Sequence, residues 1–208
     1  MTNDRKCTVC DGVIAAARRL FARYGPSKTS VEEIAREAGY SKATVYNYFS
    51  GKESVIAGVI EYDRKELIAR LAQAVAEAEG PVQGLRAFFL TRTRHMQKHQ
   101  QEYRAVKEDF LRHMPQVVKA IERNRKEERK IIEQVLEEGI AAGAFHPVKD
   151  VAVTADVLFT TIMGLTFPLF GKPVARSLED RVEELIALFL TGICSDRERK
   201  RILNKERK

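Results

Sequence analysis

Apolar residues recur three and four positions apart along almost the whole of this 208-residue chain. That spacing places them on one face of an α-helix, and no alternating run bounded by turn residues predicts a strand. The spacing therefore restricts the chain to an all-α fold. Because 44% of the residues are hydrophobic, the helices have enough apolar side chains to pack a core.

Glycine, proline and capping residues divide the pattern into separate helices. The first is predicted over Thr8–Tyr24. It ends there because Gly25 favours a left-handed cap and Pro26 cannot continue a helix. A short third helix is predicted over Lys42–Tyr48, with Ser41 as its N-cap.

The second helix lies between these two, in the segment TSVEEIAREAG. It opens with two overlapping capping boxes, one from Thr29 to Glu32 and one from Ser30 to Glu33. Gly39 is predicted to end it.

Longer amphipathic helices follow the first fifty residues. They are predicted at 53–79, 82–99, 102–113, 115–142, 148–170 and 177–195. Since short helices give way to long ones near residue 52, we predict one domain at 1–52 and a larger helical domain at 53–208.

The stretch YSKATVYNYF, residues 40–49, contains no carboxylate although 31% of the chain is charged. Two helices joined by a turn with one glycine have the spacing of a helix-turn-helix, whose second helix enters the major groove of DNA. A carboxylate there would face phosphates, whereas hydroxyls, an amide, a lysine and phenols can donate to them. Val45 and Phe49 are predicted to face inward. The stretch favours double-stranded DNA as a partner.

The run IAAARRLFARYGPSKTSVEEIAREAGYSKATVYNYFSGKESV, residues 14–55, resembles the DNA-binding region of the TetR (tetracycline repressor) family of bacterial transcription regulators. Apolar, glycine, hydroxyl, aromatic and lysine positions agree together. They are Ile14, Ala17, Phe21, Gly25, Thr29, Ser30, Val31, Ile34, Ala35, Ala38, Gly39, Ser41, Thr44, Tyr46, Tyr48, Phe49, Lys52 and Glu53. Tyr40 and Ala43 depart from the residues usual in the family.

The resemblance implies two kinds of DNA contact. Phosphates would be held by Thr29, Ser30, Ser41, Tyr46 and Lys52. The residues nearest the bases would be Lys42, Ala43, Thr44, Asn47 and Tyr48. Thr29 and Ser30 also fit a purely capping role, and Tyr48 also fits a packing role.

A single helix-turn-helix offers a small interface, so we expect a homodimer on a palindromic operator. Two recognition helices would then enter major grooves about 34–36 Å apart. The two long C-terminal helices, 148–170 and 177–195, are apolar enough to form the dimer, and the resemblance implies a four-helix bundle. Burial within one chain is the alternative.

The remaining length of the chain predicts a site for a small, largely apolar effector among the long helices. Its candidate residues are Phe89, Arg92, Met96, Phe110, Met114, Phe159, Met163 and Phe167. Aromatic and methionine side chains at helical spacing also fit an ordinary core. Arg92, with His95 and His99 on the same helix, is expected to lie on a solvated face, with a polar anchor for the effector as the alternative.

The formal charge of +7 and the pI near 9.4 favour an anionic partner, although such a charge also serves solubility. Three cysteines and the absence of a secretory signal indicate a cytoplasmic protein. Residues 151–170 have the length of a membrane span, but Asp156, Gly164 and Pro168 favour a buried helix, so no membrane partner is expected.

No catalytic, cofactor or metal site is predicted. Cys7 and Cys10 lack a second pair of ligands, and His95 and His99 offer only two. A phosphate-binding glycine loop, a nucleophile elbow and an H-E-x-x-H motif are all absent from the sequence, which argues against an enzyme. The basic tail, 197–208, is typical of a solvated terminus, with an electrostatic role in nucleic-acid binding as the alternative.

The sequence thus predicts a ligand-responsive dimeric transcription regulator, a repressor that a small apolar effector releases from DNA. A swing of the helix at 53–79 would transmit the effector signal. The alternative is a helical small-molecule binding or carrier protein whose helix-turn-helix is purely structural.

Overall fold

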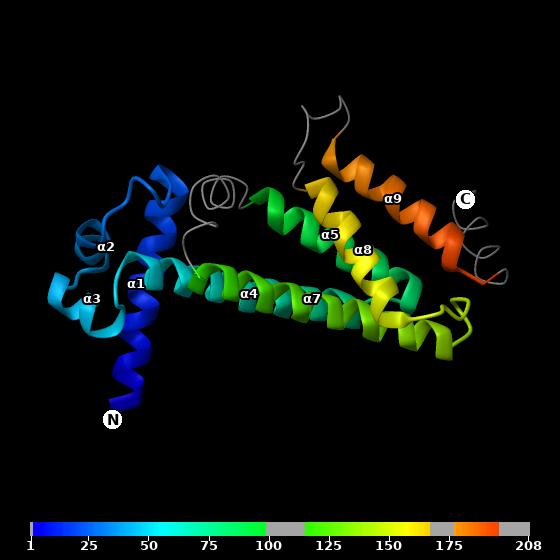
Figure 1. The fold of residues 1–208 in the computed structure, drawn as a ribbon, viewed down its shortest axis with the longest axis horizontal. Coiled ribbons are helices and arrows are strands. Elements are labelled where there is room, and N and C mark those ends of the chain that lie inside the picture. Colours follow the sequence, from blue (N-terminus) through cyan, green and yellow to red (C-terminus); the bar gives the residue numbers. More distant parts are fainter. Residues whose placement is uncertain (1, 99–114, 167–176, 196–208) are drawn as a thin grey trace. The chain divides into compact units, whose positions relative to one another are not determined.

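The structure is a computed structural model that describes residues 2–98, 115–166 and 177–195 (Figure 1). Within these ranges every regular element is an α-helix, as predicted. The helices are α1 (Thr2–Tyr24), α2 (Val31–Ala38), α3 (Lys42–Tyr48), α4 (Lys52–Ala76), α5 (Pro81–Lys98), α7 (Pro115–Ala141), α8 (Val151–Thr166) and α9 (Leu178–Ile193). The helix predicted at 102–113, the end of 148–170 and the basic tail lie outside the described residues.

The described helices belong to two compact units, each with its own apolar core. The first unit takes its residues from 1–66 and 98–125, and the second from 67–97 and 126–208. The helices α4 and α7 contribute to both units. The domain boundary predicted after residue 52 falls in the first turn of α4 and stays a prediction.

The core of the first unit joins α1, α2 and α3 to the start of α4. Ala17 and Phe21 of α1 pack with Ile34 of α2, Val45 of α3 and Ile56 of α4. These side chains recur at helical spacing in the sequence, so burying them on one side fixes which side of each helix stays outside.

An arginine of α1 forms ion pairs with the middle of α4. Arg18 lies 2.9 Å through Nε from a carboxylate oxygen of Asp63 and 3.3 Å through a terminal nitrogen from Glu66. Its guanidinium carbon also lies 4.6 Å from the centre of the Tyr62 ring. Asp63 is buried, so this pairing keeps a charge that would otherwise be costly inside the unit.

The connection between α1 and α2 confirms one of the two predicted capping boxes. Ser30 caps α2 and exchanges hydrogen bonds with Glu33, whose carboxylate accepts from the Ser30 backbone N–H at 2.7 Å. The box from Thr29 to Glu32 is wrong, because Thr29 donates its hydroxyl to the Gly25 carbonyl at 2.9 Å instead. Gly25 takes the predicted left-handed conformation, with φ 80°.

The second unit packs α5, α7, α8 and α9 around aromatic and aliphatic side chains, including Phe88, Phe89, Leu136 and Leu158. After α7 the chain turns back, and the Phe145 ring occupies the space beside Gly139. An isolated β-bridge pairs Phe145 with Cys194, which is fully buried. Among the described residues, no helix combines the length and the apolarity that crossing a bilayer requires.

Candidate DNA-binding surface and effector core

The short helix α3 separates its side chains into a buried and an exposed face. Val45 is fully buried, and Phe49 directly after the helix is buried too. The exposed residues are Ser41, Lys42, Ala43, Tyr46 and Asn47, and Thr44 and Tyr48 are half-buried. The inward positions of Val45 and Phe49 confirm that prediction. Seven of the ten predicted DNA-binding residues therefore lie on one short, outward segment.

The other three predicted DNA-binding residues surround the start of α2. Thr29 is 2% exposed and donates its hydroxyl to the Gly25 carbonyl. Its side chain therefore stabilises the loop between α1 and α2. Ser30 is half-buried in the capping box described above. Lys52 donates from Nζ to the Ser27 carbonyl at 3.1 Å, and partial burial lowers the pKa of its ammonium. Lys52 thus reaches across to the same loop.

Hydroxyl groups organise the first turn of α3. Ser41 Oγ caps the helix by accepting from the Thr44 backbone N–H at 3.0 Å, and the two hydroxyls lie 2.8 Å apart. Thr44 is therefore tied to the cap, whereas Ala43 and Asn47 project from the helix with large exposed fractions.

A carboxylate that sequence reasoning missed stands beside this surface. Glu32 of α2 forms an ion pair with Lys42 of α3, and both side chains are more than half exposed. The Lys42 hydrogen bond lowers the pKa of Glu32, and the carboxylate in turn raises the pKa of Lys42. The Lys42 ammonium also lies 5.7 Å from the centre of the Tyr46 ring. The acid-free stretch 40–49 thus receives a negative charge from the neighbouring helix.

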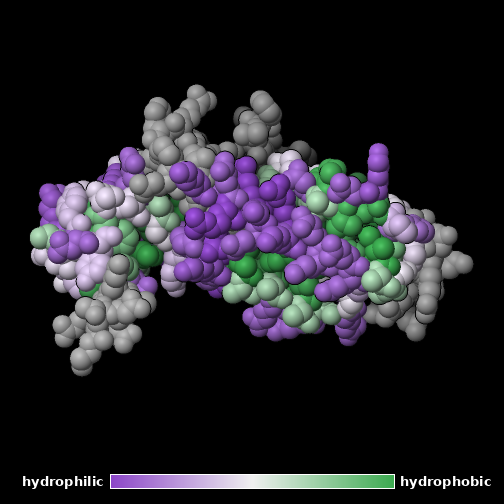
Figure 2. Space-filling view, turned by 60° about the horizontal axis from the view of Figure 1, so that its bottom comes forward, coloured by the Kyte–Doolittle hydropathy of each residue, from purple (hydrophilic) through white to green (hydrophobic). Residues whose placement is uncertain are grey.

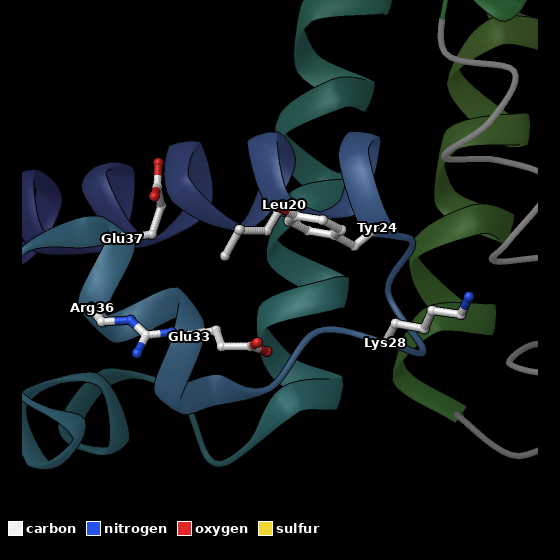
Figure 3. A pocket seen from close by; sticks show the side chains of 6 residues that line it. All are labelled: Leu20, Tyr24, Lys28, Glu33, Arg36 and Glu37. Carbon is white, nitrogen blue, oxygen red and sulfur yellow. The ribbon is translucent and has the colours of Figure 1, made fainter.

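A shallow cleft of about 330 Å³ opens on the first unit between the end of α1 and α2 (Figure 3). Leu20 and Tyr24 line it from α1, Glu33, Arg36 and Glu37 line it from α2, and Lys28 lines it from the loop between them. Two of its carboxylates have local partners, Glu33 in the capping box and Glu37 with Arg19 at 2.9 Å. A cleft with so many charges does not suit a largely apolar effector.

The second unit holds a buried ion pair inside its apolar core. Arg92 of α5 donates from Nε to a carboxylate oxygen of Glu128 in α7 at 2.5 Å, and the two residues are 2% and 1% exposed. The guanidinium carbon of Arg92 lies 5.5 Å from the centre of the Phe159 ring. One of its terminal nitrogens contacts the Met163 sulfur.

This cluster contains most of the predicted effector residues that the structure describes. Phe89 and Phe159 belong to the core of the second unit and Met163 packs against it, and Met96 of α5 is also buried. The other three predicted residues, Phe110, Met114 and Phe167, lie outside the described part of the chain.

The expectation of a solvated face for Arg92 and His95 is wrong, because both are buried. His99 is outside the described residues. Sequence reasoning also missed Glu128, although a signal was present: it precedes Ile132, Val135 and Gly139 at helical spacing and is the one acid of that buried stripe.

The helices α8 and α9 pack together and leave apolar side chains exposed. Val153 and Val157 of α8 are 59% and 52% exposed, and Leu188 of α9 is 64% exposed. A Cβ added at Gly164 or Gly192 would meet no atom within 4 Å. Figure 2 shows hydrophobic side chains at the surface of the second unit.

The part of the chain that the structure describes contains no group of candidate metal ligands. There, no three side chains of His, Cys, Asp or Glu lie together as a metal ion would require. Cys10 is half-buried in α1, and the Cys7 side chain lies outside what the structure describes.

Two family models match the chain. Residues 13–59 match the N-terminal model of "Bacterial regulatory proteins, tetR family", and residues 78–166 match the model "Tetracyclin repressor-like, C-terminal domain". The first range covers α2, α3 and most of the first core. The second covers α5 and α8, which carry Arg92 and Phe159.

Relatives and solved structures resemble the chain over most of its length. The HTH-type transcriptional repressor KstR2 of Mycolicibacterium smegmatis is 27% identical over 186 residues, which are 88% of this chain and 89% of the relative. The FadR regulator of Bacillus subtilis, solved in complex with stearoyl-CoA, has a TM-score of 0.71 at 22% identity and covers 88% of this chain and 98% of its own. A transcriptional regulator of Cytophaga hutchinsonii has a TM-score of 0.75 at 23% identity, with 88% and 97% covered.

Proposed function

The chain belongs to the tetR family of bacterial regulatory proteins, and from this premise we propose that it is a dimeric repressor that a small effector releases from a palindromic operator. Its family consists of transcription regulators rather than enzymes. We place it in the cytoplasm, where its operator would be.

The observation that carries the proposal is the outward face of α3. Lys42, Ala43, Tyr46 and Asn47 are exposed while Val45 is fully buried, so the core presents this helix to an external partner. Hydroxyl, amide and ammonium groups suit the phosphates and base edges of a major groove. A carrier protein with a purely structural helix-turn-helix has no need of such a face.

The dimer would form through α8 and α9, as two copies of the pair make a four-helix bundle. Three large apolar side chains, Val153, Val157 and Leu188, favour burial against a second copy. The open space beside Gly164 and Gly192 would let helices approach closely.

The threonines of these helices also support a dry interface. Thr161 donates its hydroxyl to the Val157 carbonyl at 2.7 Å, and Thr191 donates to the Ala187 carbonyl at 2.7 Å. These two hydroxyls are satisfied within their own helices, so a partner that excludes water would not leave either of them unpaired.

We place the effector in the second unit, at the cluster of Arg92, Phe159 and Met163. Apolar walls with a few polar groups are typical of small-molecule sites. A buried ion pair costs desolvation energy that well-packed apolar side chains would not, so Arg92 and Glu128 suit a polar anchor. The FadR regulator of Bacillus subtilis was solved with stearoyl-CoA, and we propose an effector with a comparable apolar chain and a polar end.

The effector would act by favouring one conformer over another. Its effect on DNA affinity is limited to the difference between its own affinities for the two conformers. Both α4 and α7 contribute residues to each unit, and α7 carries Glu128 of the effector core. We propose that these two helices transmit the change, with α4 delivering it to the DNA-binding head, residues 2–52.

The decisive experiment selects duplexes from a random library with the purified full chain. We expect a palindrome to be enriched, and its affinity to fall about 10³- to 10⁵-fold between 50 and 200 mM salt for about 6–10 phosphate contacts. Stearoyl-CoA added to the complex tests release. Enrichment of no palindrome would contradict the proposal and leave the carrier protein as the better description.

A further inference from the structure

The ion pair between Glu32 and Lys42 places a negative charge at the DNA-facing surface, where the recognition helix itself has none. Glu32 comes from the first turn of α2, and Lys42 is the first residue of α3. Their side chains are 53% and 57% exposed and make direct contact. A carboxylate at this position repels the phosphates that the head must approach.

The contact also limits what Lys42 can do. Its ammonium points toward Glu32 and lies 5.7 Å from the centre of the Tyr46 ring. The same hydrogen bond from Lys42 lowers the pKa of Glu32. Lys42 therefore already has an anionic partner within the protein, against which a phosphate must compete.

We propose that Glu32 is a positioning residue that holds Lys42 away from the phosphates and so weakens binding to DNA of arbitrary sequence. Binding to non-operator DNA depends almost entirely on phosphate contacts. Withholding one ammonium lowers that background, while hydroxyl and amide groups of α3 remain available to the bases. Since a genome offers an excess of competing sites, a lower background makes the operator easier to find.

The proposal predicts a change in salt dependence that a merely stabilising ion pair would not cause. In Glu32→Gln, Lys42 gains a phosphate contact, so the slope of log K against log salt on a scrambled duplex becomes steeper by about 0.9. If the two proteins bind the scrambled duplex equally at 1 M salt, this difference in slope makes the variant bind about fivefold more tightly at physiological salt. Operator affinity rises less, because base contacts fix the position of α3 there.

Two further variants isolate the pair. Adding Lys42→Met to Glu32→Gln returns the slope to that of the unaltered protein. Glu37→Gln removes a carboxylate from the same helix whose partner, Arg19, belongs to α1 and not to the recognition helix. Lys42 keeps its own partner in this control, so the slope is expected to stay unchanged. Thermal unfolding of each variant checks that the head stays folded.

The measurement uses the full chain, a fluorescent scrambled duplex and a selected operator, titrated from 50 to 300 mM salt. An unchanged slope in Glu32→Gln, or an equal change in Glu37→Gln, overturns the inference. The inference rests on the proposed function, and the two fail differently. If the unaltered chain binds no duplex, the proposed function is wrong; if it binds and Glu32→Gln behaves like it, only the role of Glu32 is wrong.

Discussion

Arg92 and Glu128 lie 36 positions apart in the chain, and Arg92 Nε donates to the Glu128 carboxylate across 2.5 Å in the core of the second unit. Both residues are almost completely buried. Neither charge has bulk water to stabilise it, so each depends on the other and on the groups around it.

Removing one member of this pair should destabilise the second unit severely. We expect Arg92→Met or Glu128→Leu alone to lower the free energy of unfolding by about 3–5 kcal/mol, because each leaves a buried charge without its partner. The double variant Arg92→Met/Glu128→Leu should unfold near the unaltered protein. Urea denaturation followed by circular dichroism completes this double-mutant cycle, and additive losses would contradict the dependence of each charge on the other.

Stearoyl-CoA provides a test of the proposed anchor in the same double variant. If Arg92 holds the polar end of the effector, the folded double variant should release its operator only at higher stearoyl-CoA concentrations than the unaltered protein. Fluorescence anisotropy of the operator measures the release. Identical titration curves would remove Arg92 from the effector site while leaving its structural role intact.

Substitutions on the DNA-binding head should separate affinity from sequence preference. Lys52→Ala and Tyr46→Phe are expected to weaken binding to all duplexes, and Lys52→Ala should flatten the salt slope by about 0.9. Asn47→Ala should instead change which duplex is selected, because we propose that the exposed Asn47 contacts the bases. Electrophoretic titration against operator and scrambled DNA distinguishes the two effects. Unaltered affinity in Lys52→Ala would show that the assigned docking is wrong.

A charge on the exposed apolar face of α8 should abolish the proposed dimer. Val157→Arg would place a guanidinium in the interface, where its desolvation opposes association. We expect a monomer by light scattering and an operator affinity reduced to that of a single head. Ala72→Arg, at an exposed position of α4, is the matched control. A Val157→Arg protein that stays dimeric would place the interface elsewhere.

Two buried glycines of the second unit should respond oppositely to alanine. A Cβ at Gly139 would lie 2.1 Å from Phe145 Cδ2, so Gly139→Ala forces the ring to move and should cost about 1–3 kcal/mol. A Cβ at Gly84 would lie 3.6 Å from its nearest neighbour, a methyl carbon of Val75. Gly84→Ala should therefore raise stability by about 0.5–1 kcal/mol, the helix preference of alanine. Similar melting temperatures for both variants would contradict this.

Local patterns predicted the described helices but not every end, since α1 begins at Thr2, six positions before the predicted Thr8. The bounds of α3 agree with prediction at both ends, and Ser41 caps the helix as predicted. These features depend on neighbouring residues, so a short window of sequence contains the information. The capping box at Ser30 was confirmed on the same grounds, whereas the box at Thr29 failed because the Gly25 carbonyl competed for its hydroxyl.

Pairings between distant helices were the part that local patterns missed. Arg92 was expected on a solvated face because its partner Glu128 belongs to another helix, and helical spacing alone does not show which charges meet. Glu32 was assigned to a capping box from its spacing to Thr29 alone. Its partner in the structure is Lys42, which belongs to another helix, α3. The ion pairs that set the charge of each candidate site join different helices, so they become visible only in the three-dimensional structure.

Some side chains of α3 are packed or hydrogen-bonded within the protein and others are not. This difference indicates which residues could be exchanged to change the DNA sequence that such a regulator binds. Val45 anchors the helix and Thr44 is tied to Ser41, while Ala43 and Asn47 are exposed. Exchanging only these last two residues would leave the head's packing in place. A collection of proteins built this way would answer one chemical signal at different promoters, which is what a designed genetic circuit needs.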